Sequence, residues 1–459
     1  MSRHLLLLLL GASLVTGCGG YASTSEQFRR SMTAGRPEQA LAAVDQALDV
    51  PRPEDLPAKS GDATLLLLER ATILQAMGRN DLSARDFETA DKKLEVLDFT
   101  SDTAGDIGKW IFSDDSTLYR APPHEKLLVN TLNMINYLVR GDASGAKIEA
   151  RRFQVNQKYY QGKVDSGDAD TKAAGMLALG SYLAGFAFEM DRDAQEAMRY
   201  YGDAASMGGV PGLAETAQRL AARSGATDER LKGLIGDPSA VPAPDPQQAE
   251  LLVIVQIGMA PFRIAERLPI GAAMVVATAP GPGARLTPDQ QRQANVFAAK
   301  GLLKFVNYPK LRRSPASRYT TVNVNVDGGL PMNGGVALSV EDRVIDAFQA
   351  VEGTILGAAI VRLITRAIAG EATDLAARKA SGNGAIGLLA GLLVEGAMTA
   401  ADTPDTRSWV TLPGRIYVAR ARVPAGRHTV NVSLGGFLRS NTVDLAPGGW
   451  GVLNFSDLR

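Results

Sequence analysis

The feature that most constrains the fold is a proline-rich break at residues 236–246, which divides the chain into two parts of different character. Four prolines fall within nine residues, at Pro238, Pro242, Pro244 and Pro246. Proline lacks a backbone N–H and fixes φ, so a helix cannot continue through such a run. We therefore expect a helical region over 26–235, a semi-stiff linker over 236–249 and a second folded region over 250–459.

The first region has the apolar periodicity of helices, is rich in Ala and Leu, and is interrupted by tight turns at Gly35, Gly78, Gly141 and Arg192. Small or aromatic residues follow each turn at helical spacing: Ala40, Val44, Ala47, Ala84, Phe87, Ala90, Ala146, Ala150, Ala197, Tyr201 and Ala204. Small side chains let helix axes approach to about 8–10 Å, as stacked helix pairs require. The pattern predicts a short, irregular array of tetratricopeptide-like (TPR-like) repeats with an insertion over 99–123. A plain helical bundle is the alternative.

The second region alternates strand-like and helical stretches. Strands are expected at 251–257, 273–277, 320–326, 416–422, 427–434 and 450–455, with a helix over 340–379 between them. An apolar, glycine-rich stretch at 385–398 is too short to span a bilayer, so we expect a buried core helix there, with membrane insertion or an oligomer interface as alternatives. The predicted fold is multidomain, an N-terminal all-α TPR-like domain followed by an α+β C-terminal domain.

Residues 1–17 have the form of a secretory signal: a charged start, the apolar run 5–10 and small residues before Cys18. The apolar run is shorter than the roughly 20 residues that a transmembrane helix needs. Val-Thr-Gly before Cys18 resembles the bacterial lipobox, which implies that the thiol carries a diacylglycerol. Cys18 is the only cysteine, and a thioether is inert where a free thiol would be a liability. An ordinary signal peptide is the alternative.

Acyl chains on Cys18 would anchor the chain stably at a membrane. The next residue is Gly19 rather than aspartate, which by resemblance to sorted lipoproteins favours the outer membrane, with the protein facing the periplasm. Residues 18–25 are expected to form a short lipidated tether. The helical region would then lie close to the membrane, and the second region would reach further away across the linker.

Composition and histidine content argue against several classes of function. The 49 basic and 49 acidic residues cancel, so the charge balance does not favour nucleic acid as a partner. His4 leaves with the signal, which leaves His124 and His428, too few for a metal cluster or a Cys–His pair. We expect His124 to start a helix after two prolines and His428 to lie at a strand edge. No cofactor, metal site or catalytic residue is predicted.

Three motifs in the mature chain carry a family resemblance. The first covers 121–126 and continues to Tyr137 and to 149–152; the second covers 258–263; the third, and most specific, covers 401–413. Together they resemble an uncharacterised family of bacterial lipoproteins with TPR-like repeats, over about residues 118–431. The resemblance implies an outer-membrane lipoprotein without known enzymatic activity, often encoded beside small lipoproteins similar to activators of peptidoglycan synthases. The third motif departs from the family pattern at Thr403-Pro404.

Within these motifs, Arg407 and Trp409 are the main candidates for an interaction or structural role. Their alternation with Thr406, Ser408 and Val410 predicts one face of a strand, on which a guanidinium can stack on an indole. A structural clasp at the start of the final sheet is the first interpretation, and a partner contact is the second. Further candidates are Pro261, Arg263, Glu125, Tyr137 and Arg151.

The sequence thus predicts a non-enzymatic, lipid-anchored periplasmic scaffold. Its helical-repeat groove would bind envelope proteins, and the lipid on Cys18 would hold it to the membrane. An envelope enzyme acting on peptidoglycan, or a direct regulator of one, is the alternative.

Overall fold

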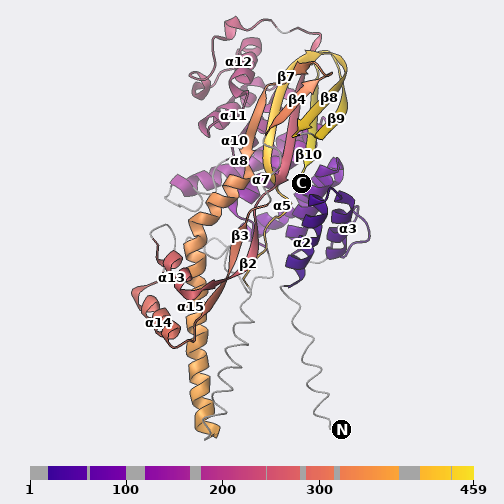
Figure 1. Ribbon diagram of the computed structural model, residues 1–459. Helices are drawn as coiled ribbons and strands as arrows, with labels where there is room; N and C mark the ends of the chain where they lie inside the picture. The colour runs from indigo at the N-terminus through magenta and orange to yellow at the C-terminus, as the bar shows by residue number, and fades with distance from the viewer. Residues whose placement is uncertain are drawn as a thin grey trace.

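The computed structural model has an N-terminal region of paired helices followed by a mixed α+β region with several sheets, as expected (Figure 1). It describes residues 19–58, 62–99, 119–165, 177–243, 245–279, 286–314, 321–381, 404–435 and 437–459. Cys18, where lipidation is predicted, and residues 385–398, where a buried helix is predicted, lie outside this part of the chain.

The helical region is built from pairs of antiparallel helices joined by short turns. Its helices are α2 (Gly19–Thr33), α3 (Pro37–Ala47), α4 (Ala63–Ala76), α5 (Asn80–Phe99), α7 (Pro123–Val139), α8 (Ala143–Asp165), α10 (Ala178–Met190), α11 (Ala194–Ser206) and α12 (Leu213–Ser224). All four predicted turn residues, Gly35, Gly78, Gly141 and Arg192, have positive φ, which allows the sharp reversal between paired helices. The predicted packing residues after the turns are buried, apart from Ala47.

Helix α2 begins at Gly19, so the prediction of a tether up to residue 25 was wrong for the described residues 19–25. The sequence Gly-Gly-Tyr-Ala-Ser-Thr-Ser has weak helix propensity, so by itself it does not predict a helix. Burial of Tyr21 and Phe28 against the following helices holds the helix in place, since tertiary packing outweighs intrinsic propensity.

The α+β region contains two four-stranded sheets and a two-stranded ribbon. The first sheet has the order β10-β1-β7-β6, the second has the order β5-β4-β8-β9, and the ribbon pairs β2 with β3. The strands are β1 (Gln248–Met259), β2 (Phe262–Pro269), β3 (Phe305–Arg312), β4 (Val322–Val326), β5 (Leu330–Pro331), β6 (Gly334–Ser339), β7 (Pro413–Pro424), β8 (Gly426–Leu434), β9 (Phe437–Leu445) and β10 (Trp450–Asp457). Strand β1 pairs parallel with β10 and antiparallel with β7. Five of the six predicted strands are present, and β2, β3, β5, β6 and β9 were not predicted.

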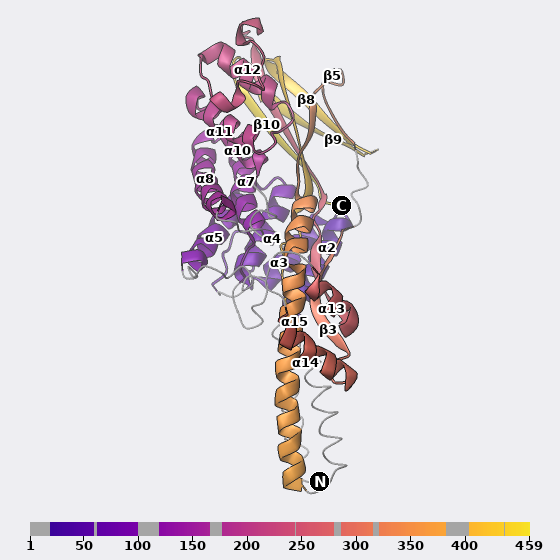
Figure 2. The same cartoon turned by 90° about the vertical axis from the view of Figure 1, so that its left-hand side faces the viewer.

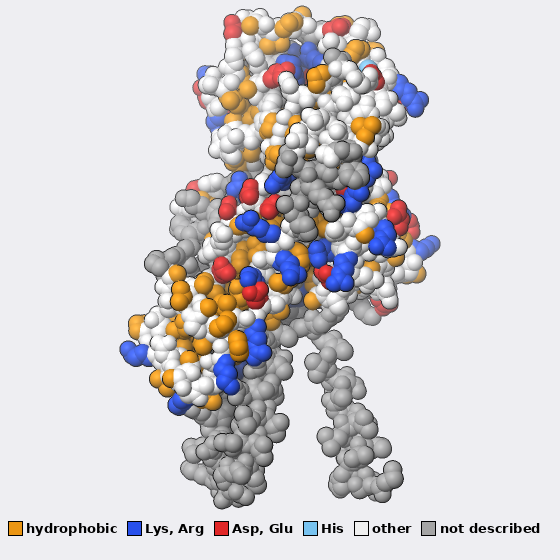
Figure 3. All heavy atoms as spheres, viewed as in Figure 1, with side chains coloured by type: hydrophobic (Ala, Val, Ile, Leu, Met, Phe, Trp, Pro, Cys, Tyr) orange, Lys and Arg blue, Asp and Glu red, His pale blue; other side chains and the backbone are white. Residues whose placement is uncertain are grey.

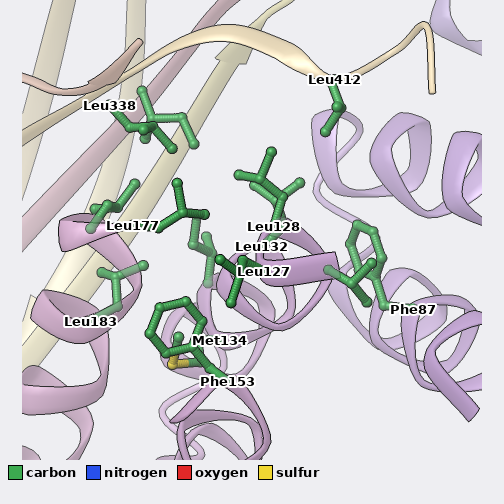
Figure 4. Close-up of a cluster of buried hydrophobic side chains, with 14 of the residues drawn as sticks. Phe87, Leu127, Leu128, Leu132, Met134, Phe153, Leu177, Leu183, Leu338 and Leu412 are labelled. Atoms are coloured by element: carbon green, nitrogen blue, oxygen red, sulfur yellow. The ribbon is translucent and has the colours of Figure 1, made fainter. Parts of the chain in front are cut away.

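Helices, first sheet and second sheet form three successive layers. Strand β1 is buried on both faces: Leu252 and Ile254 join the core of the helical region, whereas Leu251 and Val253 join the core between the two sheets. Figure 4 shows Leu412, in the segment that leads into β7, among side chains from the helices. The helices and the first sheet therefore share one hydrophobic core, so the two regions are packed against each other.

The proline-rich stretch lies on the protein surface and is not a free spacer. Asp237 caps the short 3₁₀ helix η2 (Pro238–Ala240) by accepting from the Ser239 N–H at 2.8 Å. The Gln218 amide of α12 donates to the Asp237 carbonyl at 2.9 Å. Strand β1 starts at Gln248, so the last two residues of the predicted linker belong to the sheet.

A separate small unit projects from the body of the protein, and we call it the apolar arm (Figure 2). It consists of the ribbon β2–β3 and of α13 (Ile270–Thr278), α14 (Pro288–Ala299) and α15 (Val340–Ser381), around a core of its own. The prediction of a strand at 273–277 was wrong, because these residues lie in α13. A short apolar run does not distinguish a strand from a helix, and here α13 packs on α15.

Candidate functional site

The segment 404–412, which we call the clasp segment, lies against helices α2, α4 and α7 just before β7 begins at Pro413. It has no strand structure, so the prediction of a strand through Arg407 and Trp409 was wrong. The reason lies in its backbone N–H groups, several of which bond to side chains of the helices instead of joining a sheet. All three sequence motifs contribute residues to this place.

Glu69 of α4 is the centre of the contact. Its Oε1 accepts from the Val410 N–H at 2.7 Å and from the Tyr21 hydroxyl at 2.7 Å, and its Oε2 accepts from the Thr411 N–H at 2.9 Å and from the Thr411 hydroxyl. Burial raises the pKa of Glu69 from its ordinary 4.5 to about 7, although these four donors oppose the shift. The two carboxyl oxygens thus accept the backbone N–H groups of the clasp segment, as the carbonyls of a neighbouring strand would do in a sheet.

Trp409 fills the space beside Glu69 and is only 1% exposed. Its indole N–H donates to the Thr72 hydroxyl at 3.0 Å, and its ring lies 5.8 Å from that of Phe87 at an interplanar angle of 57°. A buried tryptophan with a satisfied N–H is a strong packing anchor. The indole therefore joins the clasp segment to both helices of the α4–α5 pair.

Arg407 forms the polar edge of the clasp segment. Its Nη1 donates to Asp62, next to the start of α4, at 2.7 Å, while its Nε and Nη2 bind the two oxygens of Asp405 at 3.0 and 2.8 Å. Despite partial burial, these two carboxylates raise the pKa of the guanidinium. Arg407 thus links the clasp segment to the helical region by charge.

The first motif supplies a second buried carboxyl. Glu125, in the first turn of α7, accepts from the Tyr119 hydroxyl and, at 3.5 Å, from the Trp409 N–H. Burial raises its pKa to about 7. His124 precedes it at the start of α7, as predicted, and burial together with the charge of Arg263 lowers the pKa of its imidazole to about 3. It is therefore neutral at pH 7.

The second motif lies on the other side of the clasp segment. The Arg263 N–H donates to the Ser408 hydroxyl at 3.2 Å, and its guanidinium reaches the Arg407 carbonyl at 3.5 Å. The Ala260 N–H donates to the Leu412 carbonyl at 2.8 Å, beside the buried Pro261. Five of the predicted residues, Arg407, Trp409, Glu125, Arg263 and Pro261, are therefore brought together.

Tyr137 and Arg151 lie elsewhere, on α7 and α8. The Tyr137 hydroxyl bonds to Glu88, and the Arg140 guanidinium lies 5.4 Å from the Tyr137 ring. Arg151 is exposed, with its guanidinium 5.7 Å from the Phe188 ring. These contacts of the two residues lie within the helical region.

His428 is also separate from the clasp. It lies near the start of β8, where its ring nitrogens approach Asp327 and the Pro424 carbonyl, each at 2.7 Å. Its hydrogen bond to the Asp327 carboxylate raises the pKa of the imidazole. This contact joins two strand ends, which agrees with the structural role predicted for this histidine.

Several buried charged residues were not predicted. Glu69 and Arg70 stand within an apolar run of α4, and a charged pair in such a run is a sequence signal for a buried polar site. Arg70 binds Asp86 at 2.6 Å and Asp45 at 3.0 Å. A second buried ion network joins Arg420 of β7 to Glu189 of α10 and to Glu250 of β1. The Arg420 guanidinium lies 2.9 Å from each of the two carboxylates.

Chemically, the clasp binds backbone and aromatic groups of its own chain. The carboxyls of Glu69 and Glu125 are engaged by N–H and O–H donors, and the histidine beside them is neutral. Among the described residues, no group of three or more His, Cys, Asp or Glu is placed to hold a metal ion. The arrangement resembles recognition of an extended peptide by helices, with the peptide supplied in cis.

Comparison with known proteins adds no assignment. No protein-family model, curated protein or solved structure matches this chain. The family resemblance drawn from the three motifs therefore stays a prediction.

Proposed function

We propose that this protein is a lipid-anchored scaffold at the periplasmic face of a bacterial outer membrane, which binds another envelope protein and carries out no catalysis. Two features support the anchor: the lipobox-like sequence at Cys18, and the start of the folded body at Gly19 directly after it. The paired helices are a common framework for protein binding.

The clasp segment limits which surface of the helices a partner can contact. It covers the sides of α2, α4 and α7 around Glu69, so a partner protein has to use another part of the helical region. We propose the outer face of α8. The exposed apolar side chains on this face are the observation on which the proposal depends.

Three large apolar side chains, Ile148, Val155 and Tyr159, are exposed on α8. Their spacing of seven and four residues places them on one side of the helix. Val155 is 69% exposed. Large apolar side chains that are grouped and exposed on one surface mark an interaction site. The exposed cations Arg151 and Lys158 flank these side chains. An apolar protein surface bordered by acidic residues would complement it.

Site-specific photocrosslinking tests this proposal. A photoreactive residue at position 155, in the lipidated protein in intact cells, should give one discrete protein adduct, and the same residue at the exposed position Glu38 of α3 should not. Ile148→Glu should abolish the adduct at 155. Identical adducts at both positions, or an adduct that survives Ile148→Glu, would contradict binding through α8.

The anchor is tested separately. Cys18→Ser should abolish labelling by a radioactive fatty acid. Retained labelling would end the lipoprotein interpretation.

A further inference from the structure

The apolar arm has a surface unlike the rest of the protein. Figure 3 shows hydrophobic side chains gathered over α13 and α14, with Lys and Arg side chains around their edge. Four exposed large apolar residues belong to the arm: Val275, Val296, Phe305 and Ile368. A contiguous apolar patch with a polar rim marks an interaction surface.

Helix α13 provides the most apolar part of this surface. Its nine residues include no charged side chain, and Val275 is 69% exposed. Its neighbours Ala272 and Ala279 are also exposed, while Ala273 and Ala277 face the core of the arm. The Thr278 hydroxyl donates to the Met274 carbonyl at 2.7 Å, so the one polar side chain is satisfied within the helix. A surface helix normally turns a polar face to water, and α13 does not.

Cations surround this apolar face. Without Arg263, which lies at the clasp segment, the ribbon β2–β3 and helices α13 and α14, over residues 264–279 and 286–312, contain six Lys or Arg and two Asp or Glu. The two acidic residues pair with Lys310 and Arg292. The Arg267 guanidinium lies 4.4 Å from the exposed Phe305 ring, and the Lys300 ammonium lies 5.5 Å from the Phe297 ring. An apolar face bordered by aromatic and basic side chains is typical of structures that lie in the interface of a bilayer.

Helix α15 supports the same interpretation. Its stretch Val340–Ile368 is 29 residues long, with a mean hydropathy of 1.5 in its most apolar window, only 39% of which is buried. Length and composition would let it cross a membrane, but one face packs on α13, α14 and β3. The arm is therefore suited to lie on a bilayer with its helices packed together.

The arm also lies on the appropriate side of the molecule. In Figures 1 and 2 it extends toward the same end of the protein as the first turn of α2, where Gly19 follows Cys18. The β-sheets lie at the opposite end. The expectation that the whole second region reaches away from the start of the mature chain is thus wrong for the arm.

We propose that the apolar arm is a second membrane-binding site, which inserts the outer face of α13 into the headgroup region of a bilayer and places its cations among anionic phospholipids. This inference rests on the proposed function only in taking the lipid on Cys18 to hold the arm near a membrane. The surface itself is independent of the lipid.

Fluorescence in vesicles tests the site directly. The full mature chain with Cys18→Ser has no other cysteine, so Val275→Cys or Val155→Cys adds a single position for an environment-sensitive dye. These two valines are equally exposed, at 69%, which makes them a matched pair. Vesicles of phosphatidylethanolamine and phosphatidylglycerol should shift the emission to the blue at position 275 and leave it unchanged at 155.

Vesicle flotation gives a second measurement. Val275→Glu in the Cys18→Ser chain should reduce the bound fraction at least tenfold, while Val155→Glu should leave it unchanged. Unchanged emission at 275 with vesicles, or a blue shift that needs no vesicles and grows with protein concentration, would overturn the proposal, the latter in favour of a second copy covering the arm. Loss of the α8 crosslink with retained vesicle binding would refute only the proposed scaffold function.

Discussion

Glu69→Gln is expected to change how the stability of the protein depends on pH. Burial raises the pKa of Glu69 to about 7 in the folded protein, compared with an ordinary value of 4.5. A raised folded-state pKa means that the folded protein holds the proton more tightly than the unfolded chain. The resulting stabilisation is complete below pH 4.5 and is lost as the pH rises through about 7. Glutamine does not titrate, so the variant lacks this dependence.

The size of the effect follows from the pKa values. The gap between 4.5 and about 7, at about 1.36 kcal/mol for each pH unit, corresponds to about 3 kcal/mol in the free energy of unfolding. The Val410 and Thr411 N–H groups bond to different oxygens of Glu69, and an amide has one acceptor oxygen. The variant should therefore be about 1–3 kcal/mol less stable at pH 4.5. At pH 8 this deficit should close or reverse.

Urea unfolding of both proteins at intervals between pH 4.5 and 8 measures the difference. Glu250→Gln is the control: although Glu250 is buried, the charges of Arg420 and Arg219 lower the pKa of its carboxyl to about 2. Its contribution is complete above pH 4.5 and is lost only as the pH falls toward 2, so this variant should show a constant deficit over the measured range. A deficit of Glu69→Gln that is equally constant would refute the reasoning.

Four further substitutions, one of them a control, probe packing and the interface between helices and sheets. Trp409→Ala should lower the free energy of unfolding by about 3–5 kcal/mol because it empties a fully buried site, and a loss below 1 kcal/mol in urea titration would contradict the clasp. Gly145→Ala should destabilise by about 1–3 kcal/mol, because its Cβ would lie 2.2 Å from a ring carbon of Tyr137, while Gly162→Ala in the same helix, with no atom within 4 Å, should be neutral or stabilising; thermal denaturation compares the two. Arg420→Ala should cost about 3 kcal/mol, since the buried carboxylates of Glu189 and Glu250 lose a buried cation and keep the more exposed Arg223 and Arg422, and an unchanged melting temperature would argue against the buried network.

Local signals in the sequence predicted the helical region well. The turns can be recognised in the sequence because a positive φ is needed where paired helices reverse. Glycine adopts a positive φ without strain, as at Gly35, Gly78 and Gly141. Central strands such as β1 can also be recognised in the sequence, because a strand that is buried on both faces has a continuous run of apolar residues.

The candidate site was predicted in its parts but not in its arrangement. Arg407 and Trp409 are among the predicted residues, yet the alternation over 406–410 is typical of a strand, whereas the segment has no strand structure. Its partner Glu69 lies 341 residues away from Val410 along the chain, and no local pattern carries such a pairing. The same limit explains the missed edge strands and α13.

Helix α2, which follows Cys18 directly, connects the proposed anchor to the clasp segment. The Tyr21 hydroxyl bonds to Glu69 at 2.7 Å and approaches the Ser408 carbonyl at 2.6 Å, so α2 is fixed to the clasp. Tyr21 follows Cys18 by three residues, a distance of at most about 11 Å of extended chain. If Cys18 carries the lipid, as we propose, the clasp lies no further from the anchored residue than this stretch of chain plus the length of the Tyr21 side chain. The membrane that holds Cys18 then also limits the orientation of the body, and the arm, which projects on the same side, is brought to that membrane.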